Sequence, residues 1–167
     1  MSERISLADY DPRWPDLFER EAGRIRSALR NRALRIEHVG STSVPSLIAK
    51  PTIDMLLVVS NSADESDYAP SLESAGYILK IREPKWYEHR MFIGSDDDIN
   101  LHVLSSGCEE IDRMVKFRDW LRSNPADRDL YARTKQAMAQ KEWTNVQEYA
   151  DTKTAIVVEI MNRASGM

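Results

Sequence analysis

The sequence predicts a single α+β domain over residues 1–167, and the order of its patterns along the chain is the main reason. A helical pattern comes first, strand-like apolar runs fill the middle, and three helical patterns fill the last third. A chain of 167 residues is of one-domain size, and no Pro-, Gly- or Ser-rich linker divides it. Its 42% hydrophobic and 30% charged residues are typical of globular proteins and argue against disordered or collagen-like classes.

The first expected helix spans about residues 13–33, with Pro15 tolerated in its first turn. Its apolar stripe includes Trp14, Phe18 and Ile25, which recur at helical spacing. Residues 34–39 predict a strand that runs into the small-residue turn at residues 40–43, and a short helical turn is expected over 44–49.

The middle of the chain predicts four further strands, at residues 53–59, 77–81, 90–93 and 99–104, with a helix at 68–75 between the first two. Residues 53–59 form a continuous apolar run, typical of a strand buried on both faces, that only Asp54 interrupts. The turn-prone residues 94–98 predict that the last two strands form an antiparallel hairpin.

The last third predicts three helices, at residues 108–123, 127–143 and 146–164. Ser106 and Glu109 match a capping box at the start of the first one.

The net charge and the cysteine content indicate which kinds of partner and which cellular compartment to expect. The net charge of −4 provides no general attraction to nucleic acid or to an anionic membrane. Cys108 is the only cysteine, so no intramolecular disulfide forms, and a reducing compartment is expected. The longest apolar run is far shorter than the roughly 20 residues of a membrane helix, so we expect a cytoplasmic protein.

Each C-terminal helix carries a cation on its own apolar stripe: Arg118, Lys135 and Lys153, the last two one turn after Tyr131 and Tyr149. Burying an unpaired cation is costly, so each must pair, lose its proton, reach solvent or face an anion. For a single residue, an internal ion pair or a side chain that extends to solvent is the simpler interpretation. The three together favour a pocket for an anion comparably well, with phosphate as the obvious ligand.

Residues 37–54, EHVGSTSVPSLIAKPTID, resemble the signature of the GrpB family. Other segments follow in the order that family shows, including Trp14-Pro15, Leu101-His102-Val103, residues 117–122 and the helices that carry Lys135 and Lys153. The resemblance therefore covers nearly the whole chain. One departure is Ser46, where the family usually has glycine.

The resemblance implies a nucleotidyltransferase-like fold, a small mixed sheet with flanking helices and a three-helix C-terminal segment. It implies that Gly40, Ser41, Thr42, Ser43 and Lys50 hold phosphate oxygens and that Asp54 holds Mg²⁺. The second carboxylate of the superfamily motif should stand two residues after Asp54, on the same strand face, and Leu56 occupies that position. Asn100 and His102, which stand where a third acid belongs, are poor Mg²⁺ ligands.

Two functional hypotheses follow for a small-molecule nucleotide or phosphorylated metabolite. In the first, the protein is a Mg²⁺-dependent nucleotidyltransferase in which Asp54 and His102 are catalytic and the cations with Tyr131 and Tyr149 contact the substrate. In the second, the scaffold has lost its metal pair and only binds the ligand. Fusions of GrpB-like segments to dephospho-coenzyme A kinase suit either hypothesis. The nucleotide, the acceptor and the oligomeric state are not predicted.

Two further groups of residues could be functional but also have a structural explanation. An isolated strand histidine such as His38 is usually structural. Trp86, Tyr87, His89 and Arg90 mix aromatic and cationic character in one expected loop, which would suit stacking on a base or a plain surface.

Overall fold

The computed structural model of the chain describes residues 6–95, 98–140 and 146–166, with only the backbone of residues 146, 147, 149 and 150. It contains the helices α1 (Trp14–Leu29), α2 (Ala69–Ser74), α3 (Glu109–Ser123), α4 (Pro125–Gln140) and α5 (Val146–Ala164). Its strands are β1 (Arg35–Val39), β2 (Ile53–Val59), β3 (Ile78–Glu83), β4 (His89–Ile93) and β5 (Ile99–Ser105). The α+β architecture predicted from the sequence, with a small mixed sheet and a three-helix C-terminal segment, is confirmed.

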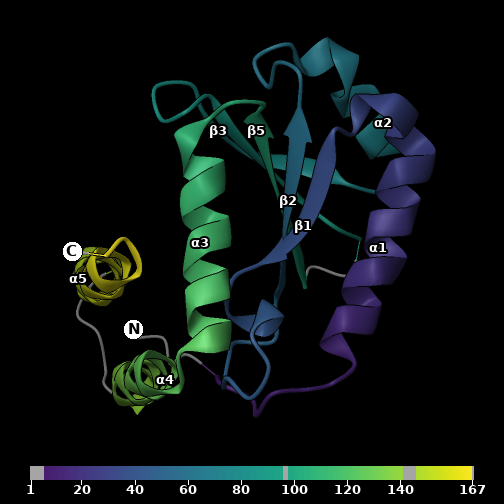
Figure 1. Ribbon diagram of the computed structural model, residues 1–167. Coiled ribbons are helices and arrows are strands. Elements are labelled where there is room, and N and C mark those ends of the chain that lie inside the picture. The colour runs from purple at the N-terminus through teal and green to yellow at the C-terminus, as the bar shows by residue number, and fades with distance from the viewer. Residues whose placement is uncertain (1–5, 96–97, 141–145, 167) are drawn as a thin grey trace.

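The five strands form one mixed sheet in the order β1-β2-β5-β4-β3. Only β2 and β5 are parallel, while β4 and β5 form the predicted antiparallel pair. Helices α1 and α2 cover one face of the sheet, and α3 covers the other, with α4 and α5 beyond it (Figure 1). The inner strand β2, covered by helices on both sides, is therefore apolar on both faces except at Asp54, as its valine- and leucine-rich run predicts.

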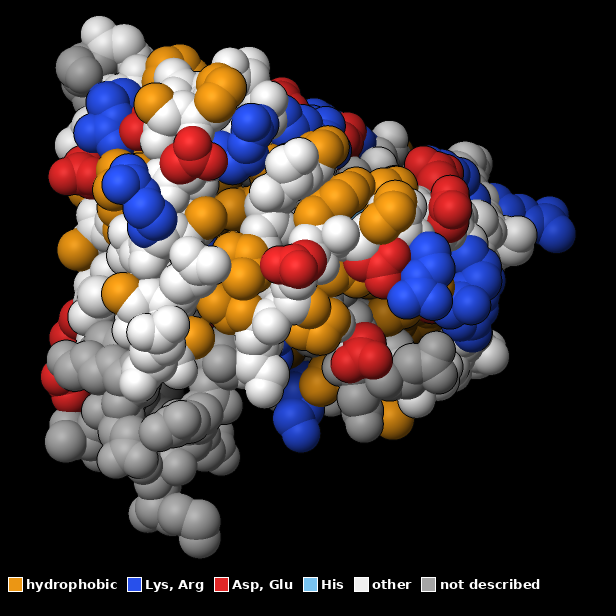
Figure 2. Space-filling model, turned by 90° about the horizontal axis from the view of Figure 1, so that it is seen from below, with side chains coloured by type: hydrophobic (Ala, Val, Ile, Leu, Met, Phe, Trp, Pro, Cys, Tyr) orange, Lys and Arg blue, Asp and Glu red, His pale blue; other side chains and the backbone are white. Residues whose placement is uncertain are grey.

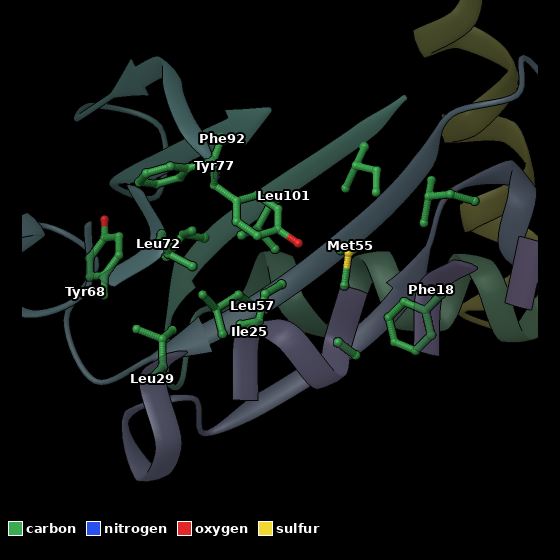
Figure 3. Packing of buried hydrophobic residues seen from close by; sticks show 14 of the residues in the cluster. Phe18, Ile25, Leu29, Met55, Leu57, Tyr68, Leu72, Tyr77, Phe92 and Leu101 are labelled. Atoms are coloured by element: carbon green, nitrogen blue, oxygen red, sulfur yellow. The ribbon is translucent and has the colours of Figure 1, made fainter. Parts of the chain in front are cut away.

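The main core lies between α1, α2 and the sheet. Figure 3 shows Phe18, Ile25 and Leu29 of α1 packed toward Met55 and Leu57 of β2. Because side chains alternate along a strand, Met55 and Leu57 point to this core while Asp54, Leu56 and Val58 point to the opposite face. Asp54 therefore faces the layer that α3, α4 and α5 form.

A buried carboxylate joins the three C-terminal helices. Asp127 of α4 accepts a hydrogen bond of 2.7 Å from Trp120 Nε1 of α3 and one of 2.6 Å from an Arg163 guanidinium nitrogen of α5. The hydrogen bonds from Arg163 hold the pKa of Asp127 below its usual value, so the carboxylate stays charged. These contacts fix α5 against α3 and α4.

Three local predictions differ from the structure. Residues 44–49 do not form a helical turn; instead a short 3₁₀ helix occupies Ser41–Ser43. The residue that caps α3 is Cys108, without a side-chain hydrogen bond, so the capping box from Ser106 is wrong. Helix α1 ends at Leu29, because Arg30 adopts a positive φ of 54° that an α-helix does not continue through.

The surface agrees with the modest net charge. Figure 2 shows acidic, basic and apolar side chains mixed on the face seen from below. Within the described part of the chain, none of the helices has the length and apolarity needed to cross a membrane.

Candidate functional site

The turn between β1 and β2 begins with a glycine that no other residue replaces without strain. Gly40 has φ +73° and ψ −177°, a conformation that is essentially restricted to glycine. A Cβ atom at this position would lie 2.6 Å from Asp54 Oδ2. The missing side chain thus lets the turn backbone approach the carboxylate of Asp54 closely.

Hydrogen bonds hold the rest of the turn rigid. Thr42 Oγ1 donates to the Thr52 carbonyl at 3.0 Å and therefore accepts from His38 Nε2, also at 3.0 Å. The Ser43 hydroxyl donates to the Gly40 carbonyl, and Arg122 Nε of α3 donates to the Ser43 carbonyl at 2.9 Å. The turn is thereby fixed to α3 and to Thr52, the residue before β2, which preorganises its outer face.

Lys135 of α4 contacts this turn, and the exposed Lys153 of α5 lines the same hollow. Lys135 Nζ donates to Ser41 Oγ at 2.7 Å and lies 5.3 Å from the ring centroid of Tyr131. Burial, and next the positive charge of Lys153, lowers the pKa of Lys135 to about 8. Among the described residues, no carboxylate forms an ion pair with either lysine. Both lysines therefore line the same space with no described ion-pair partner, and the charge of Asp54 acts on Lys135 only over a longer distance.

The turn and the lysines enclose a hollow of about 360 Å³. Lys50, Lys135 and Lys153 stand in its wall against one acid, Asp54. Three lysines against one aspartate leave two positive charges in excess. The remaining wall comes from the following residues: Leu7, Gly40, Ser41, Thr42, Thr52, Asn100, Phe117 and Tyr131.

A second hollow of about 320 Å³ shares Gly40, Asp54, Phe117, Tyr131 and Lys153 with the first. Its other wall residues are the apolar Val39, Met114, Val157 and Met161 and the polar His102, Glu110 and Arg113. Burial raises the pKa of Glu110. The shared residues make the two hollows adjacent lobes, one cationic and one mainly apolar.

The donor set around Asp54 does not fit Mg²⁺. Asp54 pairs with Asn100 across β2 and β5, and Leu56 pairs with His102, so one carboxylate, one amide and one imidazole line this part of the sheet. Among the described residues, no group of three or more His, Cys, Asp or Glu side chains is arranged to hold a metal. Mg²⁺ prefers oxygen ligands and usually one or two carboxylates, whereas a histidine nitrogen suits other ions.

The structure brings most of the predicted site residues together. Gly40, Ser41, Thr42, Lys50, Asp54, Tyr131, Lys135 and Lys153 all line the first hollow, and His102 lines the second. The side chain of Tyr149 lies outside the described residues.

Arg118 and Ser43 do not line either hollow. Arg118 donates to Glu37 Oε1 at 2.7 Å and to Asp119 Oδ1 at 2.9 Å, the internal ion pairs that were the alternative explanation for its position. The hydroxyl of Ser43 is used inside the turn.

The sequence analysis placed His89 in a loop that could stack on a base, and did not predict that it lies behind the site. His89 belongs to β4 rather than to a loop, is only 5% exposed, and contacts His102 at 3.0 Å and Glu83 at 2.7 Å. Cross-strand register would reveal these contacts, but a bulge between Leu79 and Ile81 shifts the register of β3 and β4.

Comparison with known proteins identifies the family. The model of the GrpB protein family matches residues 4–163. The chain belongs to the GrpB family. A UPF0157 protein of Halalkalibacterium halodurans is 66% identical over 161 residues, covering 96% of this chain and 83% of the relative. The crystal structure of the conserved protein GrpB from Enterococcus faecalis matches with a TM-score of 0.83 and 31% identity, covering 95% of this chain and 96% of that one.

A GrpB-like segment also occurs inside a larger protein. A dephospho-CoA kinase of Mycolicibacterium paratuberculosis is 27% identical over 175 residues, which cover 89% of this chain but 43% of the kinase.

Proposed function

We propose that this GrpB-family chain binds a nucleotide or another phosphorylated small molecule, with its phosphate groups in the cationic hollow. The observation that carries the proposal is the pair of lysines, Lys135 and Lys153, that face the Gly40–Ser43 turn with no described acid partner. Phosphate oxygens would accept hydrogen bonds from the ammonium groups and from the turn, and charge-assisted bonds of this kind are the strong ones. The hollow is within the usual size range of small-molecule sites, about 300–1,000 Å³.

The adjacent apolar lobe supports a ligand larger than phosphate. Phe117 and Tyr131 line both lobes, so a base or another apolar group would pack beside them while the phosphates stay near Lys135. This two-part arrangement favours a nucleotide over an inorganic anion.

Calorimetric titration with ATP in the presence of EDTA tests the proposal. We expect binding without a metal ion, and a loss of affinity of at least about tenfold in Lys135→Met and in Lys153→Met, because each removes one charged donor. Lys80→Met is the matched control, since Lys80 is exposed on β3, outside both hollows. Equal affinity in all four proteins would overturn the proposal.

The affinity should also depend on pH. Lys135 is protonated below its pKa of about 8, so the affinity for ATP should fall as the pH rises from 7.5 to 9.5, where the phosphates no longer titrate. Calorimetry across this range should show that the affinity of the wild type for ATP decreases by at most about tenfold per pH unit. The affinity of Lys135→Met should depend less on pH. A wild-type affinity that rises with pH would contradict this assignment.

Nucleotidyl transfer is the second candidate function, and the placement of Asp54 and His102 beside the cationic hollow favours it. Since the donor set does not fit Mg²⁺, the lysines would have to neutralise the phosphate charge. Transfer of the nucleotidyl group of ATP to an added hydroxyl acceptor, with release of pyrophosphate, by the wild-type chain but not by Asp54→Asn would establish this function. No transfer by the wild-type chain would leave the binding function alone.

A further inference from the structure

One carboxylate in the second hollow has an oxygen atom to which the protein donates no hydrogen bond. Glu110 lies one turn before Met114 and two turns before Phe117 on α3, so the three residues share the helix face that lines this hollow. The Glu110 side chain is only 13% exposed, and its Oε2 atom is buried. Within the described ranges of the chain, Oε2 is the one buried side-chain nitrogen or oxygen atom that has no hydrogen-bond partner.

A neighbouring cation does not replace the missing hydrogen bond. Arg113 Nη1 lies 3.4 Å from Glu110 Oε2 without hydrogen-bond geometry, and the Arg113 side chain is 53% exposed. An ion pair with so exposed a partner contributes little to stability. Burial accordingly raises the pKa of Glu110 more than the charge of Arg113 lowers it. Because an unpaired buried acceptor is costly, a ligand that donates hydrogen bonds to Glu110 would gain affinity from satisfying it.

The chemistry of a carboxylate determines which ligand group fits it. An ionised carboxylate only accepts hydrogen bonds, and it accepts best from two parallel N–H donors, one for each oxygen. Guanine presents two such donors side by side, the ring N1–H and the 2-amino group. Adenine and cytosine each present one amino group beside a ring nitrogen that is an acceptor, and uracil presents one N–H between two carbonyls. These three bases would therefore place an acceptor against a carboxylate oxygen.

We propose that the second hollow selects guanine nucleotides, and that Glu110 determines this specificity by accepting hydrogen bonds from N1–H and the 2-amino group of the base. The inference rests on the proposed binding of a nucleotide with its phosphates near Lys135. Phe117 and Tyr131, which line both hollows, pack against the base while Glu110 holds its edge. Rotation about the Cγ–Cδ bond of a glutamate is soft, so a small turn of the carboxylate presents both oxygens to the base.

Calorimetric titration with GTP, ITP and ATP in EDTA tests the specificity. The three ligands share the triphosphate, and ITP differs from GTP only in lacking the 2-amino group. We expect GTP to bind at least about tenfold more tightly than ATP, with ITP between them, because a site that pairs with N–H donors rejects a ligand that lacks them. Equal affinities for GTP and ATP would overturn the inference.

The variant Glu110→Gln tests the assignment to this residue. Glutamine keeps the size of the side chain but replaces one acceptor oxygen by a donor amide, so GTP affinity should fall at least about tenfold and the preference over ATP should largely disappear. Inorganic tripolyphosphate, which has no base, should bind this variant as it binds the wild type, which shows that the variant is folded. Glu109→Gln is the matched control, an exposed neighbouring carboxylate that lines neither hollow. Unchanged GTP affinity in Glu110→Gln would contradict the role of Glu110.

The failure of this inference is distinguishable from the failure of the proposed function. If tripolyphosphate and ATP bind as tightly as GTP, and all three lose affinity in Lys135→Met, the phosphate site stands and the guanine specificity is wrong. If none of these ligands binds the wild-type chain, the proposed function is wrong, and the guanine specificity with it.

Discussion

Gly40→Ala should both destabilise the protein and weaken its binding of a phosphorylated ligand. A non-glycine residue in the backbone conformation of Gly40 costs about 1–3 kcal/mol. In addition, the new methyl group would lie 2.6 Å from Asp54 Oδ2, so the carboxylate or the turn must move. Because the turn faces Lys135, we expect ATP affinity to fall by more than about tenfold, with misplacement of the turn as the cause.

Gly23→Ala is the control for this substitution. Gly23 is exposed within α1, and a Cβ atom there meets nothing within 4 Å. Replacing a mid-helix glycine by alanine should stabilise the protein by up to about 1 kcal/mol. Urea unfolding and ATP calorimetry on both variants should therefore give stability changes of opposite sign, and unchanged ATP affinity in Gly40→Ala would contradict the role of the turn.

Acid should destabilise the protein through His38. Burial, and next the positive charge of Arg122, lowers the pKa of His38 to about 4 from its usual 6.5, and the residue is 7% exposed. Between these values the unfolded chain binds a proton that the folded chain does not, so stability falls as the pH decreases from 6.5 to 4. A shift of this size corresponds to a loss of about 3 kcal/mol at pH 4.

The variant His38→Gln isolates this effect. Glutamine retains an Nε2 donor toward Thr42 but does not titrate. Urea unfolding at several pH values gives the free energy of unfolding of each protein. From pH 7 to pH 4 the value for the wild type should fall by about 3 kcal/mol more than the value for the variant. Parallel stability curves would show that His38 does not take up a proton on unfolding.

The elements of the fold were predictable because their signals are local. The apolar run at Ile53–Val59 predicts a strand that is buried on both faces. Apolar residues three and four positions apart predict α3, α4 and α5. The ends of elements were less predictable, because they depend on contacts outside the segment. The 3₁₀ helix at Ser41–Ser43 is stabilised by Thr52 of the β2 region and by Arg122 of α3, which local patterns do not reveal.

The candidate site was predictable only in part, because it also depends on contacts between elements that are distant in the sequence. Lys135 is a cation on an apolar stripe and lies at the hollow, yet Arg118 has the same signal and pairs with Glu37 on β1. Periodicity shows that a charge lies on an inner face but not which group of another element it meets. The contacts of His89 with Glu83 and His102 depend on strand register, which a single sequence specifies poorly when a bulge intervenes.

The most direct test of the central claim is to locate where a phosphorylated ligand binds. Titration of nitrogen-15-labelled protein with ATP in EDTA should shift the amide resonances of Gly40, Ser41 and Thr42 and the side-chain signals of Lys135 and Lys153, which line one hollow. Shifts confined to other basic surfaces, such as that around Arg20 and Arg24 of α1, with the turn unaffected at saturation, would contradict the claim that this hollow binds phosphate.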